Sequence, residues 1–134
     1  IELFAETEGL KTHFTNNTKM SGLMIQGDDE QLTRVFNNLI KNGIQAIPDD
    51  RDGEIVVVLE ETNSEIQVEI RDNGTGIEAD KQEKIFVPNF TTKTSGSGLG
   101  LAMVKSIVEN HNGKVWFETD PPNQTSFFVS LPKQ

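Results

Sequence analysis

The chain of 134 residues is long enough for one domain, and a hydrophobic content of 34% with eight Phe is typical of a globular protein. A formal net charge of -9 argues against a nucleic-acid-binding surface, because such surfaces need clustered Lys and Arg. The absence of cysteine excludes disulfides and thiolate metal sites, and no apolar run approaches the roughly 20 residues of a membrane-spanning helix.

Hydrophobic spacing predicts a helix at the start of the chain, over about residues 3–14. Residues 23–26 are then expected to form a short strand. The residues that recur near the helical period are Leu3, Phe4, Thr7, Leu10 and Phe14.

The segment 28–48 carries the strongest helix signal. Asp28 is the expected N-cap, Gln31 is its capping-box partner, and Pro48 ends the helix. The apolar residues fall on one stripe, which consists of Leu32, Val35, Phe36, Leu39, Ile40, Ile44 and Ile47.

The middle of the chain predicts two strands, residues 55–59 and 66–70, joined by a polar turn around residues 63–64. A short polar helix is expected over residues 79–85. The Thr-, Ser- and Gly-rich stretch 88–97 predicts a mobile loop.

The last third predicts a helix that ends at Asn112 and Gly113, followed by a hairpin of residues 114–119 and 125–131 across residues 121–124. The apolar positions of the helix are Leu99, Leu101, Val104, Ile107 and Val108. These elements predict one α/β domain with a sheet on one side and helices on the other.

Two asparagines lie one turn apart on the strongest helix, Asn38 and Asn42, with Gln45 following on the same polar line. For an isolated pair of this kind, a solvated helix edge is the more common explanation. The functional alternative is that an amide oxygen completes the ligand shell of Mg2+, which prefers hard oxygen donors.

Asp72 follows the second predicted strand and opens the stretch DNGTG, which ends at Gly76. It could be a turn-forming Asp, which is common before Asn-Gly. Alternatively, a buried carboxylate there could accept a hydrogen bond from an adenine amino group, while Gly74 and Gly76 leave room for a planar ligand.

The stretch GSGLG, residues 96–100, precedes the second apolar helix. Backbone amides at a helix N-terminus can bind phosphate, although a glycine-rich loop alone is slightly more often a linker. The stretch is not a P-loop, because no Gly-Lys-Ser/Thr follows, and the segment before it is not the strand of a Rossmann unit.

These motifs, in this order, resemble the ATP-binding catalytic domain of bacterial sensor histidine kinases. The resemblance covers the N box (about residues 29–46), the G1 box (72–76), the F box (86–90), a short ATP lid (about 90–98) and the G2 box (96–101). It implies a two-layer α/β sandwich of the Bergerat fold (GHKL superfamily). The expected sheet is mixed and mostly antiparallel, with about five strands and about three helices on one face.

The resemblance also implies roles for single residues. Asn42 would hold Mg2+, Asp72 would read adenine, and Asn38, Asn42 and Lys93 would take part in catalysis. Phe86 and Phe90 would anchor the lid by packing. The implied nucleotide-binding residues are Asn38, Asn42, Asp72, Gly74, Gly76, Ile77, Phe86, Thr92, Lys93, Gly96, Ser97, Gly98, Leu99, Gly100 and Leu101.

Two positions depart from the family pattern. Gly43 stands where the family commonly has Ala, which should loosen this helix by about 1 kcal/mol. Gln45 stands where a Lys is frequent, so that more of the phosphate contact would fall on Lys93, with Arg34 as a second candidate cation.

The expected reaction is phosphoryl transfer. Relatives that hydrolyse ATP carry a water-activating Glu where this chain has Asn38, and an amide cannot act as a general base. The phosphate acceptor is expected to be a histidine on an upstream dimerisation domain. His13 and His111 lack the sequence context of an acceptor and are expected to be structural.

We therefore expect residues 1–134 to be a single catalytic domain. It is expected to be a piece of a longer protein, either cytoplasmic or membrane-anchored, that forms a homodimer. That longer protein is expected to phosphorylate a response regulator through the acceptor domain. The fragment itself is expected to be monomeric and cytoplasmic, to bind Mg-ATP and ADP, and to contact neither nucleic acid nor the membrane interior. The alternatives are an anti-sigma-type Ser/Thr kinase, for which Glu30 is poorly placed as the base, and a degenerate ATP-binding module.

Overall fold

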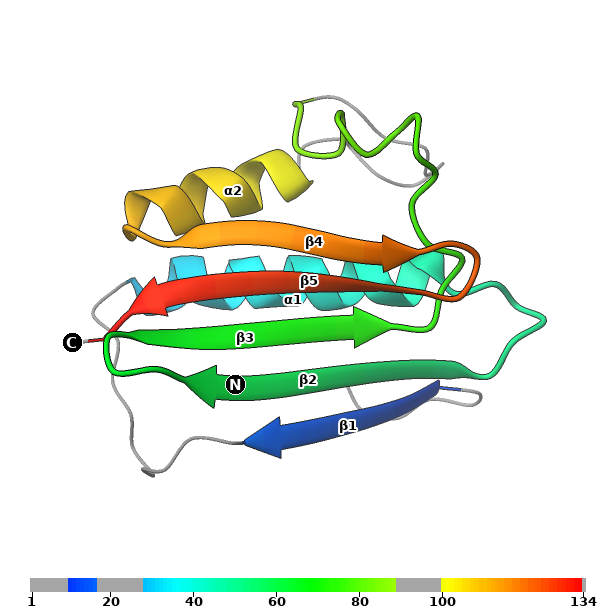
Figure 1. Cartoon of the computed structure of the whole chain (residues 1–134), viewed down its shortest axis with the longest axis horizontal. Helices are drawn as coiled ribbons and strands as arrows, with labels where there is room; N and C mark the ends of the chain where they lie inside the picture. The colour runs from blue at the N-terminus through cyan, green and yellow to red at the C-terminus, as the bar shows by residue number, and fades with distance from the viewer. Residues whose placement is uncertain (1–9, 17–27, 89–99, 134) are drawn as a thin grey trace.

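The computed structural model describes residues 10–16, 28–88 and 100–133. These residues form a sheet of five strands and a layer of two α-helices, which lie on the same face of the sheet (Figure 1). The elements in chain order are β1 (Leu10–Asn16), α1 (Asp29–Ala46), β2 (Gly53–Glu61), β3 (Glu65–Asp72), α2 (Gly100–Asn110), β4 (Lys114–Asp120) and β5 (Gln124–Pro132).

The sheet is mixed, with the strand order β1-β2-β3-β5-β4. β1 runs parallel to β2, whereas the pairs β2–β3, β3–β5 and β4–β5 are antiparallel. This topology confirms the predicted two-layer α/β class and both predicted hairpins. The structure shows two α-helices in the described residues, compared with the three expected.

The helix predicted at the start of the chain is wrong where the structure can test it, because Leu10–Asn16 is strand β1. A spacing of four residues, as between Leu10 and Phe14, fits the alternation of a strand as well as the period of a helix. The β-branched residues Thr12 and Thr15 favour the strand. Residues 3–9 and the strand predicted at 23–26 lie outside the described residues.

The helix predicted over residues 79–85 is also wrong. The N–H groups of Lys81, Gln82 and Lys84 donate to carbonyls three residues earlier, which is the pattern of successive turns rather than of an α-helix. Only Ile85 of this segment is buried. Without an apolar stripe to pack against the protein, so short a helix has little to stabilise it.

α1 begins at the predicted N-cap. Asp28 Oδ1 accepts a hydrogen bond from the Gln31 N–H at 3.0 Å, but the Asp28 N–H donates to His111 Nε2 at 3.0 Å and not to the Gln31 side chain. The Nδ1 of His111 lies 2.8 Å from the Ile107 carbonyl oxygen, so Nδ1 carries the proton and Nε2 is the acceptor. Only half of the predicted capping box forms, and His111 has a structural role that joins the two helices.

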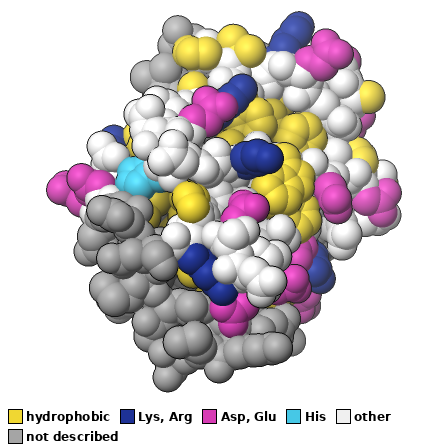
Figure 2. All heavy atoms as spheres, turned by 60° about the vertical axis from the view of Figure 1, so that its left-hand side comes forward, with side chains coloured by type: hydrophobic (Ala, Val, Ile, Leu, Met, Phe, Trp, Pro, Cys, Tyr) yellow, Lys and Arg dark blue, Asp and Glu magenta, His cyan; other side chains and the backbone are white. Residues whose placement is uncertain are grey.

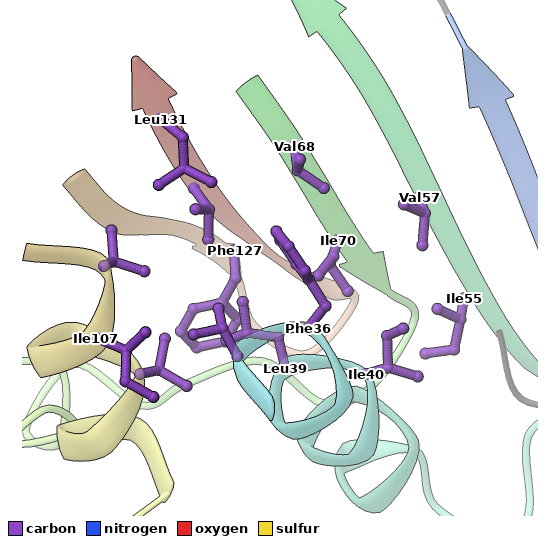
Figure 3. Packing of buried hydrophobic residues seen from close by; sticks show 14 of the residues in the cluster. Phe36, Leu39, Ile40, Ile55, Val57, Val68, Ile70, Ile107, Phe127 and Leu131 are labelled. Atoms are coloured by element: carbon purple, nitrogen blue, oxygen red, sulfur yellow. The ribbon is translucent and has the colours of Figure 1, made fainter. Parts of the chain in front are cut away.

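The core lies between the helices and the sheet (Figure 3). The predicted stripe of α1 packs against β2 and β3, and α2 packs against β4 and against α1. Each fully buried aliphatic or aromatic side chain contributes about 1.5–3 kcal/mol relative to an exposed one. The buried residues include Val35, Phe36, Leu39, Ile40, Ile55, Val57, Val68, Ile70, Val104, Ile107, Val108, Phe127, Val129 and Leu131.

α2 ends at the predicted residues. Asn112 has a φ of 62°, and the Gly113 N–H donates to the Val108 carbonyl at 2.9 Å, as in a Schellman motif. Gly113 is required for a different reason, since a Cβ there would lie 2.3 Å from the Ser130 carbonyl oxygen. Neither described α-helix has the length and apolar character needed to cross a membrane.

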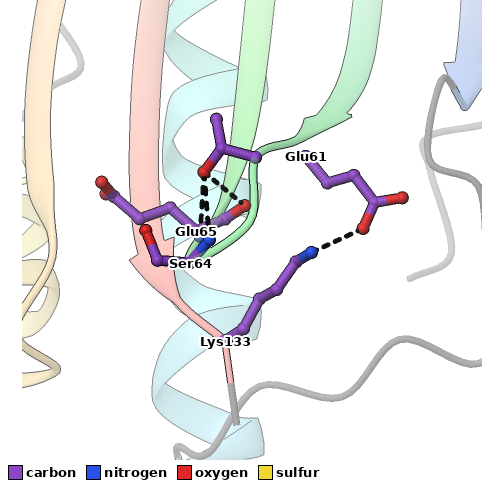
Figure 4. A network of polar contacts seen from close by, with 5 residues as sticks. Glu61, Ser64, Glu65 and Lys133 are labelled. Carbon is purple, nitrogen blue, oxygen red and sulfur yellow. Dashed lines mark hydrogen bonds and ion pairs between the residues drawn. The ribbon is translucent and has the colours of Figure 1, made fainter.

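At the end of the sheet where β2 turns into β3, side chains close the hairpin and hold the end of β5 (Figure 4). Thr62 Oγ1 accepts hydrogen bonds from the N–H groups of Ser64 and Glu65, at 3.4 and 3.0 Å. Lys133 Nζ lies 2.7 Å from Glu61 Oε2. Figure 2, in which this side of the molecule comes forward, shows hydrophobic side chains bordered by acidic and basic ones.

Candidate functional site

Asp72 is the last residue of β3, at the opposite end of the sheet from the β2–β3 turn. Its side chain is buried, with 4% of its surface exposed. Oδ1 accepts a hydrogen bond from the Gly74 N–H at 2.9 Å. A buried carboxylate needs such partners, and this one has a fixed orientation at the edge of the core.

Gly43 of α1 lies directly against Asp72. A Cβ on Gly43 would be 3.2 Å from Asp72 Cβ, 3.4 Å from Asp72 Oδ2 and 3.0 Å from Ile55 Cδ1. Gly43 therefore allows α1 to pack closely against β2 and β3. The departure from the family's Ala has a packing reason that the sequence did not reveal.

Gly74 and Gly76 are required by contacts within the chain. A Cβ on Gly74 would lie 2.6 Å from the Ala46 carbonyl oxygen at the end of α1. Gly76 has a φ of 84°, and a Cβ there would lie 2.8 Å from Pro121 Cα. The predicted reason for these glycines, room for a planar ligand, is not needed to explain them.

Asn38 connects α1 to the start of α2. Its Nδ2 donates to the Arg34 carbonyl at 2.8 Å. Its Oδ1 faces Gly100, since a Cβ added to this glycine would lie 3.1 Å from that oxygen. Asn42, one turn further on, is half-buried. The structure thus brings Asn38 and the first residue of α2 together.

α1 joins the two parts of the predicted site. Gly43, which contacts Asp72, directly follows Asn42, and Asn38 reaches Gly100 from one turn earlier. The side chain of Arg34 turns to α2, where Nη2 donates to Met103 Sδ at 3.1 Å.

Three predicted site residues, Ile77, Phe86 and Leu101, are half-buried and pack against the core. The ring centres of Phe86 and Phe117 are 6.2 Å apart, and the side-chain nitrogen of Lys105 lies 5.8 Å from the Phe86 ring centre. Phe86 thus packs against the core, and its role as an anchor of the lid stays a prediction.

Part of the predicted site, including the lid, lies outside the described residues, and its roles remain predictions. These residues are Phe90, Thr92, Lys93, Gly96, Ser97, Gly98 and Leu99.

The oxygen donors of the described site residues suit a metal ion that binds together with a phosphate-bearing ligand. Among the described residues, no group of three or more His, Cys, Asp or Glu side chains could hold a metal ion. Asn42 offers an amide oxygen, a donor that Mg2+ accepts when phosphates and water complete its octahedron. The chemistry of the described residues therefore fits Mg2+ only together with a phosphate-bearing ligand.

The sequence analysis missed the residues that hold the segment after Asp72. Arg51 donates to the carbonyls of Asn73 and Gly74, and Thr119 Oγ1 accepts from the Ile77 N–H at 2.9 Å. The one available signal was that Arg51 is the single cation in an otherwise acidic run, residues 49–52.

Comparison with known proteins identifies the family of this chain. A sequence profile of the family described as histidine kinase-, DNA gyrase B- and HSP90-like ATPases matches residues 27–134. The chain belongs to this family. The resemblance to sensor histidine kinases that the motifs predicted is confirmed, and the chain is a catalytic ATPase domain of the histidine kinase type.

Curated relatives of this ATPase domain include Sporulation kinase A of Bacillus subtilis, which is 38% identical over 112 residues, or 84% of the chain. Sensor histidine kinase ZraS of Escherichia coli K12 is 38% identical over 128 residues, or 96% of the chain. The chain spans 18% of the length of the first protein and 27% of the second.

Solved structures of the same fold include the catalytic domain of histidine kinase ThkA, with a TM-score of 0.81 and 32% identity over 93% of this chain and 80% of that one. The mycobacterial sensor histidine kinase MprB gives a TM-score of 0.81 and 27% identity over 95% of this chain and 84% of that one.

Proposed function

We propose that this domain binds ATP with Mg2+ and transfers the γ-phosphoryl group to a histidine on a separate domain of the same protein. The observation that carries the proposal is the buried carboxylate of Asp72. It is oriented by the Gly74 N–H and lies against a helix position without a side chain, Gly43.

In this proposal Asp72 accepts a hydrogen bond from the adenine amino group. Guanine presents a carbonyl oxygen at that position, which a carboxylate repels, so the same residue excludes GTP. Ile77 would lie beside the base. The other residues of the proposed nucleotide site are those of the predicted list that the structure describes, namely Asn38, Asn42, Gly74, Gly76, Phe86, Gly100 and Leu101.

Mg2+ bound with ATP would neutralise charge on the phosphates, and Asn42, supported by Asn38, would supply protein oxygen to its shell. The glycines of residues 96–100 would donate backbone N–H groups to the phosphates at the start of α2. Lys93 and Thr92 would add further contacts from the lid.

The proposed chemistry is transfer to nitrogen and not hydrolysis. The nitrogen lone pair of a neutral imidazole attacks the γ-phosphorus, the bond to the bridging oxygen of ADP breaks, and the imidazole releases its proton to solvent. This nucleophile needs no general base, which is consistent with an amide at Asn38. The task of the domain is then to position the phosphate and neutralise its charge.

The acceptor histidine is proposed to lie on an upstream helical domain that makes the whole protein a homodimer. Two histidines of the chain are accounted for differently: His13 Nε2 lies 3.3 Å from Glu54 Oε2 on the sheet, and His111 joins the helices. A solved structure shows histidine kinase ThkA in complex with the response regulator TrrA. By analogy we propose a response regulator as the final recipient, a single domain over residues 1–134, and a cytoplasmic position for it.

The test is to incubate the chain with Mg2+, γ-labelled ATP and the helical domain of the longer protein. Labelled helical domain that loses its label in acid but keeps it in alkali would indicate phosphohistidine. Label that is stable in acid and lost in alkali would instead support a Ser/Thr kinase. No transfer, from a chain that does bind ATP, would favour the non-catalytic alternative.

A further inference from the structure

Arg51 lies in the loop between α1 and β2, and one of its guanidinium nitrogens reaches three carbonyl oxygens from two other segments. Nη1 donates to the carbonyls of Asn73, Gly74 and Pro122, at 2.6, 3.0 and 3.1 Å. The first two belong to the segment that follows Asp72, and the third belongs to the turn between β4 and β5.

The first of these contacts acts on the peptide group that orients Asp72. The carbonyl of Asn73 and the N–H of Gly74 belong to one planar peptide unit, and in a trans peptide they point in opposite directions. Arg51 holds the carbonyl side of this unit, while Asp72 Oδ1 accepts from the N–H side at 2.9 Å. Because the unit is rigid, fixing its carbonyl also fixes the direction of the N–H. A cation at the oxygen further polarises the N–H that binds the carboxylate.

The second and third contacts connect this peptide to the β4–β5 turn. Gly76 packs against Pro121 without room for a side chain, and the Ile77 N–H donates to Thr119 Oγ1. Thr119 Oγ1 also lies 2.8 Å from Thr125 Oγ1, whose side chain is buried. The segment is therefore held at several points against the turn and the end of β4, and Arg51 Nη1 contacts both the segment and the turn.

We infer that Arg51 is a positioning residue for the adenine end of the proposed site, because it fixes the peptide that orients the Asp72 carboxylate. This inference rests on the proposed function. The contacts that Arg51 makes through Nη1 are to backbone carbonyls, so Arg51 is assigned no contact with the nucleotide itself. Its effect would pass through Asp72 to the base, and the phosphate contacts would not change.

This role makes a prediction that a purely structural role does not. If Arg51 only stabilised the fold, removing it would lower the unfolding temperature and leave the affinity of the folded protein unchanged. If it positions Asp72, removing it weakens binding of ATP and adenosine by the same factor at temperatures where the protein is fully folded.

The experiment compares the wild-type chain with Arg51→Met, which keeps most of the aliphatic part of the side chain and removes the donors. The matched control is Arg71→Met. Arg71 precedes Asp72 in sequence, but its guanidinium pairs with Glu69 at 3.1 Å, and strand alternation places it on the other face of the sheet. The affinities for ATP, adenosine and GTP are measured by calorimetry, and hydrogen exchange of the Gly74 and Ile70 amides is measured by NMR.

We expect Arg51→Met to weaken ATP and adenosine binding equally, by about tenfold, which corresponds to the lower end for a hydrogen bond to a charged group. The Gly74 amide should exchange faster, while the Ile70 amide in the centre of the sheet keeps its protection. Arg71→Met should change neither, and Arg51→Lys should restore part of the affinity.

Unchanged affinity and unchanged Gly74 exchange in Arg51→Met would overturn the inference, even if the unfolding temperature fell. If Arg51→Met does not fold, Arg51→Lys decides the question. A lysine keeps the positive charge but places its single nitrogen on a side chain of different length and shape, so it should give an intermediate loss. If the wild-type chain binds no adenine nucleotide, the proposed function fails. The positioning of Asp72 is then judged by Gly74 exchange alone.

Discussion

Different kinds of contact stabilise the two ends of the sheet. At the β2–β3 turn, Thr62 bonds to the next few backbone amides, and Lys133 pairs with Glu61. At the other end, the chain after Asp72 is held by Arg51 and by Ala46, both more than 20 residues away in sequence.

This difference has a consequence for substitutions. The side-chain contacts of Thr62, Glu61 and Lys133 at the turn end are made by exposed or half-buried residues, and such contacts contribute little to stability. The contacts at the Asp72 end are made to backbone carbonyls and by glycines that lie against neighbouring backbone. Any larger residue in place of these glycines would clash with that backbone. We expect substitutions at the Asp72 end to affect both stability and ligand binding, and those at the turn end to affect neither strongly.

The largest expected effect is that of Gly74→Ala. The new methyl group would meet the Ala46 carbonyl at 2.6 Å, and a backbone group cannot rotate away. We expect a loss of about 3 kcal/mol in the free energy of unfolding, measured with urea. Asn63→Ala, in the exposed β2–β3 turn, serves as the control, with an expected change within about 0.5 kcal/mol. Equal midpoints for the two variants would contradict the difference between the ends.

Asp72→Asn should follow, with its main effect on binding. The amide can still accept from the Gly74 N–H through Oδ1, so the fold is retained, but its NH2 group opposes the adenine amino group. We expect ATP affinity to fall by about a hundredfold or more, which corresponds to about 2.7 kcal/mol. Glu69→Gln, on the same strand but paired with Arg71 and Ser126, should leave ATP affinity unchanged. Retained ATP affinity in Asp72→Asn would remove this residue from the site.

Gly43→Ala tests the close packing of α1 against Asp72. Alanine should gain about 1 kcal/mol of helix propensity, offset by crowding against Ile55 Cδ1 at 3.0 Å. We expect a net change in stability within about 1 kcal/mol, and a loss of about threefold in ATP affinity because the Asp72 side chain must shift.

A double-mutant cycle sharpens this prediction. Ile55→Val removes the crowded methyl group, so Gly43→Ala should cost less in its presence than alone. Strict additivity of the two changes would show that Ile55 does not limit the space at Gly43.

The smallest effect is expected at the turn end. Lys133→Met removes the ion pair with Glu61. The Lys133 side chain is 23% exposed and the Glu61 side chain is 13% exposed. The expected loss of stability is within about 1 kcal/mol, with ATP affinity unchanged. A change in ATP affinity would mean that the two ends of the sheet are coupled.

The sequence predicted those features that depend on local pattern. α1 and the strands β2 to β5 follow from periodicity, from the cap at Asp28 and from the turn residues, because each signal lies within a few residues. β1 was mistaken for a helix because Leu10 and Phe14 fit both periods. Asp72 and the two N-box asparagines were selected as candidate site residues through their motifs, and their roles stay predictions.

What the sequence could not predict depends on contacts between distant segments. Gly74 is fixed by Ala46, Gly76 by Pro121 and the start of α1 by His111, and none of these partners is close in sequence. Arg51 has no motif because it binds carbonyl oxygens, which every residue possesses. The purpose of such residues becomes clear only once the sheet brings the segments together.

The most direct test of the account is calorimetric titration of the chain with ATP, ADP and GTP, with and without Mg2+. We predict that ATP and ADP bind, that GTP does not, and that Mg2+ strengthens ATP binding. Binding of GTP as tightly as ATP would contradict the role of Asp72, and the absence of any nucleotide binding would contradict the proposed site as a whole.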